Sequence, residues 1–323
     1  MTLRKSAPLL AKLVVSIGLL SWLFINLDTS SLLAYVNVAT LSTVVALAMV
    51  NASFTFVLAY RWGLILSFLK SPLTLINAGK NIIIGMFFNQ VLPSTIGGDV
   101  VRIWLAKRWG LSISVAANSI ISDRIFGFMG LVLLCLFGWP FVYSLTENEL
   151  MTIGEGIVIG IGISGVVSLY VIQHFPVRWK QMKVLSWLVG ISNASIGVIV
   201  NSGSGTRIVV LSIIMHIFDI TMVFIVAQVC DIALSWTTCA ILLPPALLVS
   251  AAPISIAGWG VREGVVVFAL GAAGVGVNEA IILSLFYGLI HALTGLIGGM
   301  VWVMTPHDEL DLEREEELVN HTV

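Results

Sequence analysis

Charged side chains are scarce in this sequence. Only 10% of its 323 residues are charged, whereas 58% are hydrophobic and the mean hydropathy is +1.04. A soluble domain carries about 25% charged residues, so this chain has too few polar side chains to cover a water-exposed surface. It also lacks a basic cluster interleaved with aromatic residues, which excludes a nucleic-acid partner. The composition indicates a membrane protein.

Motifs for metal ions, cofactors and catalysis are also missing. The three cysteines form no C-x-x-C pair, so neither a zinc site nor a redox pair is encoded. We interpret Cys135, Cys230 and Cys239, which lie in or beside apolar runs, as small packing residues. There is no H-E-x-x-H motif, no catalytic triad signature and no phosphate-binding loop with its lysine. We therefore expect no metal, no cofactor, no catalytic residue and no enzymatic activity.

The sequence does contain a series of long apolar runs. They predict membrane-spanning helices at about residues 10–27, 38–60, 112–142, 152–173, 207–230 and 280–304. The first run follows Arg4, Lys5 and Lys12 but has no small-x-small cleavage site, so we expect an uncleaved span rather than a signal peptide. The predicted fold class is an all-α polytopic membrane protein.

Lysine and arginine are distributed unevenly between the two sides of this arrangement. With the N-terminus in the cytoplasm, every loop that holds a basic residue falls on the inside. The outside loops hold only acids, namely Asp28, Glu147, Glu149 and Asp231. Positive loops mark the cytoplasmic side, so we expect both termini in the cytoplasm. Residues 1–306 are then one transmembrane domain, and residues 307–323, with seven acids against Arg314, are a solvated tail.

Two hydrophobic stretches, at about residues 75–110 and 236–274, are interrupted by glycine and proline. The basic loops all stay on the cytoplasmic side if each stretch is a re-entrant hairpin, which enters and leaves the membrane on one side. The same holds if every arm spans fully, which gives about ten spans, so the positive-inside rule does not separate the two. Short arms interrupted by Gly and Pro favour re-entry, from the cytoplasm for the first stretch and from outside for the second.

The two broken stretches carry the same motif. Residues 93–102 read PSTIGGDVVR and residues 253–262 read PISIAGWGVR, so Pro, Ile, Gly, Val and Arg coincide without a gap. Such a repeat predicts two halves, residues 38–142 and 207–304, to which the hairpins give opposite topology. We therefore expect an inverted repeat. Between the halves we expect one span, a short amphipathic segment and a flexible linker at residues 201–206.

Seven ionisable side chains lie at membrane depth, where each costs about 2.5–3.5 kcal/mol to insert and needs a partner. They are Asp99, Arg102, Asp123, Arg124, Asp219, Arg262 and Glu263. An arginine fork near a helix start suits a phosphate group. We therefore expect a lipid head-group site made by Arg102, Arg262 and Arg124, with Asp99, Asp123 and Glu263 as counter-charges. The alternative is a structural helix cap with intramembrane ion pairs.

Each predicted hairpin tip contains residues that stop a helix or let the backbone turn. They are Pro93, Gly97 and Gly98 in the first tip, and Pro253 and Gly258 in the second. Asp99 then occupies the expected N-cap of the following helix, and Arg102 shares its face three residues later.

Arg262 and Glu263 are adjacent in the sequence, so we expect them to face different ways and to need different partners. We predict that the charges pair across the two halves. In this hypothesis Glu263 pairs with Arg102 or Arg124, and Arg262 pairs with Asp99 or Asp123.

Further polar residues lie on predicted spans. Residues 119–123 put two serines and Asp123 on one helix face, either lining a cavity or joining helices by hydrogen bonds. His216 and Asp219 share another face and are a candidate proton relay, with a hydrogen-bonded packing pair as the alternative. His291 is expected to serve packing.

Three stretches of the chain resemble a known family. They read FNQVLPSTIGGDVVR at residues 88–102, SDR at 122–124 and PISIAGWGVREG at 253–264. They are similar to the flippase-like transmembrane domain of the lysylphosphatidylglycerol synthase family, although Ala257 stands where a glycine is expected. The resemblance implies a polytopic inner-membrane protein that moves a lipid between leaflets. The soluble aminoacyl-transfer domain of the better-studied members is not in this sequence, so the resemblance does not imply synthase activity.

The expected function is translocation of an anionic or phosphate-bearing lipid across the cytoplasmic membrane, with that lipid as the partner. No ATP motif is present, so transport is expected to be downhill or coupled to an ion. Two alternatives are an intramembrane transferase acting on a lipid head group and a non-transporting partner of a lipid-modifying enzyme. A lined cavity between the hairpins would favour transport, and a solid, fully paired interior would favour the partner role.

Overall fold

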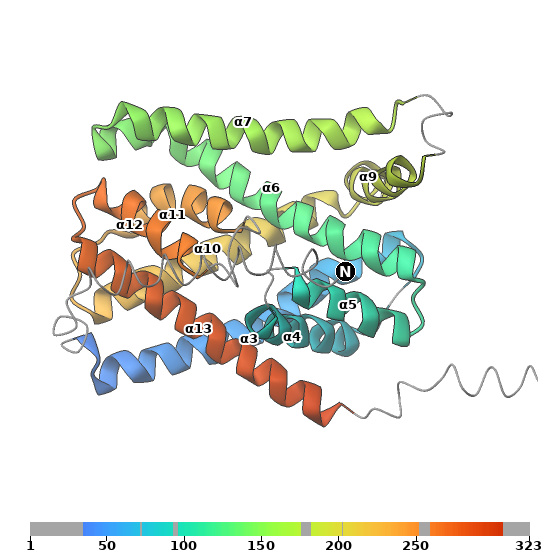
Figure 1. Ribbon diagram of the computed structural model, residues 1–323, viewed down its shortest axis with the longest axis horizontal. Helices are drawn as coiled ribbons and strands as arrows, with labels where there is room; N and C mark the ends of the chain where they lie inside the picture. Colours follow the sequence, from blue (N-terminus) through green and yellow to red (C-terminus); the bar gives the residue numbers. More distant parts are fainter. Residues whose placement is uncertain are drawn as a thin grey trace, which may run out of the picture.

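The fold consists of helices. Figure 1 shows the computed structural model, which describes residues 35–71, 73–92, 96–175, 182–201, 203–251 and 259–305. In these ranges the helices are α3 (Val38–Phe68), α4 (Leu75–Val91), α5 (Gly97–Arg108), α6 (Ile113–Thr146), α7 (Glu149–Ile172), α9 (Lys183–Asn201), α10 (Gly205–Val229), α11 (Trp236–Ser250), α12 (Val261–Gly271) and α13 (Val277–Met304). The predicted all-α membrane class is confirmed for the described residues. The predicted first span at 10–27 and the tail at 307–323 lie outside them.

Of the described helices, five are long and apolar enough to cross a membrane, namely α3, α6, α7, α10 and α13. Each coincides with a predicted span. The largest difference is at the end of α3, which continues past the predicted end at residue 60 to Phe68. It continues because Trp62, Ile65 and Leu66 are fully buried and give these turns an apolar face to pack. Arg61 therefore lies inside the helix bundle and not in a loop.

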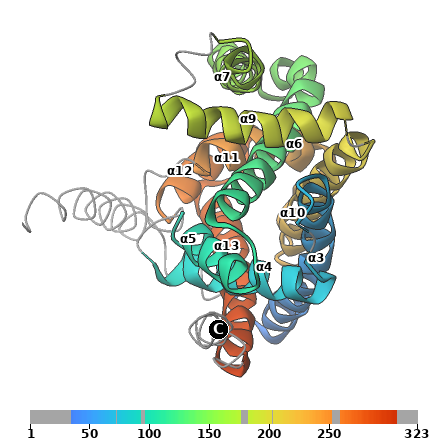
Figure 2. The ribbon, with the colours of Figure 1, turned by 90° about the vertical axis from the view of Figure 1, so that its right-hand side faces the viewer.

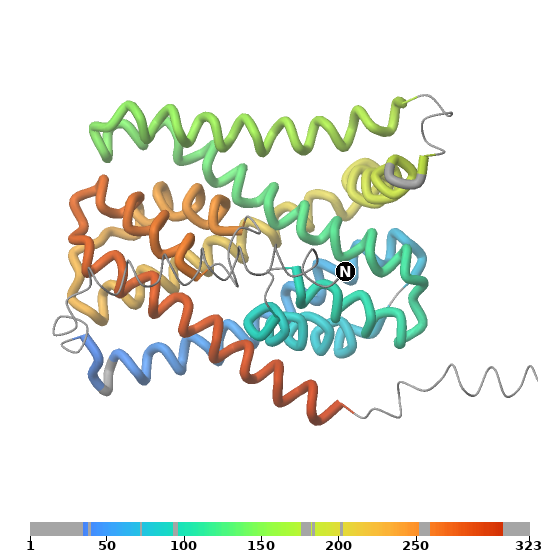
Figure 3. Tube along the Cα trace, viewed as in Figure 1, coloured from blue at the N-terminus to red at the C-terminus, as the bar shows by residue number. Residues whose placement is uncertain are grey.

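The long helices run along the long axis of the molecule, and the chain passes back and forth between its two ends (Figures 1 and 3). Lys70 and Arg108 lie at the end where α3 and α5 finish. Glu147, Glu149 and Asp231 lie at the opposite end, where α6 and α10 finish and α7 begins. The ends of the bundle therefore carry the charge difference on which the predicted orientation depends.

Two pairs of short helices occupy the broken hydrophobic stretches. α4 and α5 have 17 and 12 residues, and α11 and α12 have 15 and 11. At about 1.5 Å per residue, even α4 is shorter than the roughly 30 Å of a bilayer hydrocarbon core. The two pairs lie toward opposite ends of the long axis (Figure 1). The connecting tips, with Pro93, Pro253 and Gly258, lie outside the described residues.

The order long, short, short, long occurs twice along the chain. Helices α3 to α6 have 31, 17, 12 and 34 residues, and α10 to α13 have 25, 15, 11 and 28. The first short helix of each group packs against the last helix of the other, α4 on α13 and α11 on α6. Where α13 meets α4, a Cβ on Gly298 would lie only 1.9 Å from the carbonyl oxygen of Ile83. The two groups of helices are therefore interlocked.

Two glycines allow α5 to lie close against α4. A Cβ on Gly98 would come within 2.1 Å of the carbonyl oxygen of Gly85, and one on Gly97 within 2.6 Å of the Cβ of Leu92. A Cβ on Gly85 would lie 2.7 Å from the side chain of Arg102. Gly97 and Gly98 both belong to the first turn of α5 and have no positive φ. These two glycines therefore allow close contact between helices. The sequence had suggested instead that they let the backbone turn.

The segment between the two groups ends in α9, which is seen end-on in Figure 1 and lengthwise in Figure 2. It therefore crosses the long helices and does not run beside them. Ile191, Ala194 and Val198 bury one face of it, as predicted for an amphipathic segment. α9 ends at Asn201 and α10 begins at Gly205, so the connection is shorter than the predicted linker.

Candidate functional site

A cavity of about 400 Å³ lies between the two groups of helices. Both groups contribute to its lining, the first through α3 to α6 and the second through α10 to α13. The charged side chains that line it within the described ranges are four arginines and three aspartates: Arg61, Arg102, Arg124, Arg262, Asp99, Asp123 and Asp219. Arg102 and Arg262 are each only 7% exposed. The arginines of both predicted hairpins therefore share one cavity, and neither lies in bulk water.

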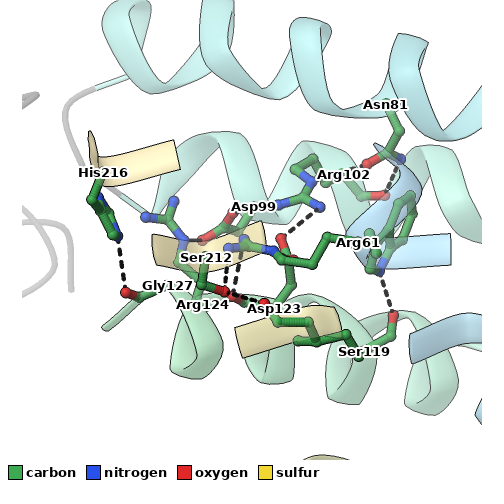
Figure 4. Close-up of polar contacts among 12 residues, drawn as sticks. Arg61, Asn81, Asp99, Arg102, Ser119, Asp123, Arg124, Gly127, Ser212 and His216 are labelled. Atoms are coloured by element: carbon green, nitrogen blue, oxygen red, sulfur yellow. Dashed lines mark hydrogen bonds and ion pairs between the residues drawn. The ribbon is translucent and has the colours of Figure 1, made fainter. Parts of the chain in front are cut away.

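Arg61 holds three helices together at the base of this cavity (Figure 4). Its Nε and Nη2 both lie 2.9 Å from Oδ1 of Asp123 on α6, and its Nη1 donates to the hydroxyl of Ser212 on α10 at 2.9 Å. Sequence reasoning missed this residue because the predicted span ends at residue 60, which left Arg61 in the cytoplasmic loop that was expected to follow. The signal that could have found it is the apolar sequence from Trp62 to Phe68, which continues the helix beyond the charge.

Arg102 is fixed by α4 and turned toward two carboxylates. Its Nε donates to Oδ1 of Asn81 at 3.0 Å, and Nδ2 of Asn81 donates back to the carbonyl oxygen of Arg102 at 2.9 Å (Figure 4). Its Nη1 lies 3.6 Å from Asp99, three residues earlier on the same helix face as predicted, and its Nη2 lies 3.6 Å from Asp123. The guanidinium also lies over the ring of Trp62, at 5.1 Å.

Asp99 is not the N-cap of α5. The helix begins at Gly97 and its cap position, Ile96, makes no side-chain capping bond. Asp99 lies in the first turn and instead accepts a hydrogen bond from Nε of Arg124 on α6 at 2.7 Å. The arginine is stronger than a backbone amide as a partner because it carries a full charge. The N–H of Gly98 is satisfied by Oδ1 of Asn89 at 2.9 Å.

Arg262 and Glu263 pair with each other, contrary to the expectation that neighbours face different ways. Nε of Arg262 donates to Oε1 of Glu263 at 2.9 Å, and its Nη2 contacts the same oxygen. Oε2 of Glu263 accepts from the N–H of Gly260 at 2.6 Å. Gly260 has a φ of 88°, which favours glycine and forms the turn into α12. The guanidinium lies 4.6 Å from the ring of Trp259, so its face is covered as well.

The predicted cross-pairing between the halves is therefore wrong. Asp99 and Asp123 are held by arginines of α3, α5 and α6, and Glu263 is held by Arg262 of its own helix. The physical reason is the length of the arginine side chain, which lets a guanidinium curl back to a nearby acid. What the two groups share is the cavity and not the ion pairs.

The polar face of α6 divides between two roles. The indole N–H of Trp62 donates to the hydroxyl of Ser119 at 3.1 Å, and the hydroxyl of Ser195 donates to that of Ser122 at 2.9 Å. Both α6 serines are fully buried and join helices, while Asp123 alone of the three lines the cavity. Both sequence interpretations of this face are therefore correct, each for different residues.

Two histidines flank Asp219 at the wall of the cavity. Nδ1 of His216 lies 3.5 Å from Oδ2 of Asp219, and Nε2 of His291 lies 3.8 Å from its Oδ1. The second ring nitrogen of each histidine donates to a carbonyl oxygen, that of Gly127 at 2.9 Å and that of Tyr287 at 3.1 Å. His291 thus belongs to the cavity lining and not only to the packing that the sequence suggested. Within the described residues, no cluster of side chains forms a metal-binding group.

Comparison with known protein families agrees with this geometry. Residues 9–299 match the family model of the lysylphosphatidylglycerol synthase TM region. The chain belongs to this family. The match runs from before α3 into α13 and includes both arginine-bearing motifs, so the resemblance seen in the sequence is confirmed. No curated protein and no solved structure gives a significant match. Membership in the lysylphosphatidylglycerol synthase TM region family indicates a membrane role connected with lipids.

Proposed function

We propose that this lysylphosphatidylglycerol synthase TM region protein moves an anionic, phosphate-bearing lipid across the cytoplasmic membrane. It does so without changing the lipid chemically, so it is not an enzyme. The observation that carries the proposal is the cavity of about 400 Å³ faced by four guanidinium groups from both groups of helices. A guanidinium binds phosphate oxygens through paired N–H donors, and it stays positively charged even where it is buried.

Arg102 is the best placed of the four to receive a phosphate. Its contacts with Asp99 and Asp123 are both 3.6 Å, longer than the roughly 2.7–2.9 Å of a charge-assisted hydrogen bond. Its Nη2 has no hydrogen-bond partner among the described residues, although it is buried. A phosphate oxygen in the cavity can accept this unused N–H. Arg124 and Arg262 then bind the same head group, while Asp99, Asp123 and Glu263 balance the charge of the empty site.

The proposed transport route has an inverted repeat, with each hairpin entering the membrane from one side and returning. Three observations support it: the repeated helix order, the short arms at opposite ends of the long axis, and the exchanged packing of α4 on α13 and α11 on α6. In this topology the end with Lys70 and Arg108 faces the cytoplasm, together with both termini. The head group then crosses between the hairpins while the tails stay in the bilayer.

Transport by purified protein in vesicles tests this function directly. Arg102→Ala is expected to slow the movement of fluorescent anionic phospholipids or polyprenyl phosphates about 10- to 100-fold, because a hydrogen bond to a charged group contributes about 1.5–3 kcal/mol. Arg124→Gln is a second variant whose side chain is 38% exposed, so its folding is less at risk. Arg207→Ala, which removes an exposed arginine of α10 outside the cavity, is the matched control. Unchanged transport in both cavity variants would exclude the head-group role.

We further propose that His216, Asp219 and His291 carry the proton that couples transport to the membrane gradient. Each histidine already donates one N–H to a backbone carbonyl and turns its other nitrogen toward Asp219. A neutral ring presents a lone pair there, which repels the carboxylate. Uptake of one proton converts either contact into a charge-assisted hydrogen bond. The trio is therefore suited to hold one proton and to pass it between α10 and α13.

Replacing Asp219 with asparagine is expected to remove the response of transport to a proton gradient, because the amide cannot hold the proton between the histidines. The measurement compares lipid movement in vesicles with and without an imposed pH difference. Asp231→Asn provides the control, since Asp231 is an exposed acid just beyond the end of α10. A wild-type protein whose transport ignores the gradient would rule out the relay and leave downhill movement.

A further inference from the structure

A second cavity, of about 560 Å³, lies between α6, α7 and α11. Among the residues that the structure describes, none with a polar side chain lines it. It is formed by aliphatic and aromatic side chains such as Phe128, Met129, Leu169 and Val249, together with Gly162 and Gly165 of α7. A head group would find no hydrogen-bond donor in this space, so the cavity suits only an apolar occupant. We call it the apolar groove.

The apolar groove adjoins the arginine cavity. Phe128 lines both cavities and forms a partition between them. Because Phe128 is 38% exposed, it is not part of a close-packed core. The last turns of α11 divide in the same way: Leu247 and Ser250 face the arginine cavity, whereas Leu248 and Val249 face the groove. The two spaces are therefore neighbours along α6 and α11.

Hydrogen bonds join α7 to its neighbours near both of its ends. Toward its start, the carbonyl oxygen of Thr152 accepts a hydrogen bond from the indole of Trp139 at 2.9 Å. Toward its end, the carbonyl oxygen of Leu169 accepts one from Ser192 of α9 at 2.5 Å.

Between these two hydrogen bonds, α7 approaches α6 at Gly162, where a Cβ would lie 2.4 Å from the side chain of Val132. One turn later the helices leave open space, because a Cβ on Gly165 would meet no atom within 4 Å. The helix lies along the edge of the bundle, away from α10 and α13 (Figures 1 and 2).

We propose that the apolar groove holds a hydrocarbon chain of the lipid whose phosphate binds among the arginines. This inference rests on the proposed function. The groove lies along the middle turns of α6 and α7, at a depth where lipid hydrocarbon is the surrounding solvent. A lipid with its head group in the arginine cavity needs an apolar site for its tail, and the groove adjoins that cavity at Phe128. The transported substrate is therefore a phosphate lipid with a long flexible chain, and a water-soluble phosphate ester is not transported.

Photolabelling of the wild-type protein tests the occupant without any substitution. The probe is an anionic phospholipid with a diazirine in the middle of one acyl chain, incorporated in vesicles with the protein. Labels are expected to concentrate on Met129, Leu169 and Val249, in excess over Ile157 and Val167, which face outward from α7. Equal labelling of the inward and outward residues would mean ordinary bilayer contact and would overturn the proposal.

Filling the groove tests its role in transport. Gly165→Trp places a large ring in the open space and is expected to slow phospholipid transport about tenfold, the loss that corresponds to about two methylene contacts. Gly160→Trp adds the same ring to the exposed side of α7, where a Cβ also meets nothing, and is expected to transport like the wild type.

The outcomes separate this inference from the proposed function. If the wild type transports lipid and Arg102→Ala does not, but Gly165→Trp is as fast as Gly160→Trp, the groove is not the tail site and the head-group role stands. If the wild type moves no lipid at all, the proposed function fails. Labelling confined to the groove would then still identify a bound hydrocarbon chain, and labelling spread over α7 would reject both.

Discussion

Replacing Arg61 with alanine is expected to lower the free energy of unfolding by about 3–5 kcal/mol, the usual effect of removing one partner of a buried ion pair. Arg61 is only 5% exposed and supplies the short contacts to Asp123. Without it, Asp123 keeps only the 3.6 Å contact with Arg102, and Ser212 loses a donor. A buried carboxylate would then lack most of its compensating charge.

Thermal unfolding of the purified protein in detergent measures this effect. Arg207→Ala serves again as the control and is expected to change stability by less than about 0.5 kcal/mol, because its side chain is exposed. The double variant Arg61→Met with Asp123→Leu is expected to recover most of the lost stability, since it removes both buried charges. If Arg61→Ala unfolds at the wild-type temperature, the network of α3, α6 and α10 is not a structural element.

Replacing Glu263 with alanine is the second change with a large expected effect, again about 3–5 kcal/mol. Glu263 is completely buried and accepts hydrogen bonds from Arg262 and from the N–H of Gly260. The variant leaves a buried guanidinium without its acid and an amide of the α12 start without its acceptor. Both losses act on the turn that carries Arg262 into the cavity, so transport is expected to fall together with stability.

The chain offers a matched control for this second change. Glu279 makes the same capping contact at the start of α13, accepting from the N–H of Gly276 at 3.1 Å, but it holds no buried arginine. Glu279→Ala is expected to lower stability by about 0.5–2 kcal/mol, the range for loss of a helix cap. Equal unfolding temperatures for the two variants would show that the Arg262 pair adds nothing beyond the cap.

The sequence predicts the long helices well because their signal is local. Each apolar run satisfies its own backbone hydrogen bonds as a helix, whatever its neighbours are. The pairing of Asp99 with Arg102 is local in the same sense, since residues three apart share a helix face. The repeated motif also marked correctly two arginines of the cavity, Arg102 and Arg262. These predictions needed only spacing along one helix.

The partners of the charges could not be predicted in the same way. Arg61 was placed in a loop because charge usually ends a membrane span, and only the burial of Trp62 and Leu66 against other helices explains why α3 continues. The pairing of Arg262 with its neighbour depends on the turn at Gly260, whose φ of 88° the sequence does not specify. The role of His291 depends on α13 lying beside α10. Each of these features comes from packing between distant segments.

The exchanged packing of α4 on α13 and α11 on α6 has a consequence for how the protein is made. α4 leaves the ribosome well before α13, so the surface of α4 that packs against Gly298 has no native neighbour until α13 is made. The first group of helices must therefore enter the membrane with one side provisionally covered, by lipid or by the insertion machinery. Assembly is completed only when α13 arrives, which makes biogenesis of the two halves a single event.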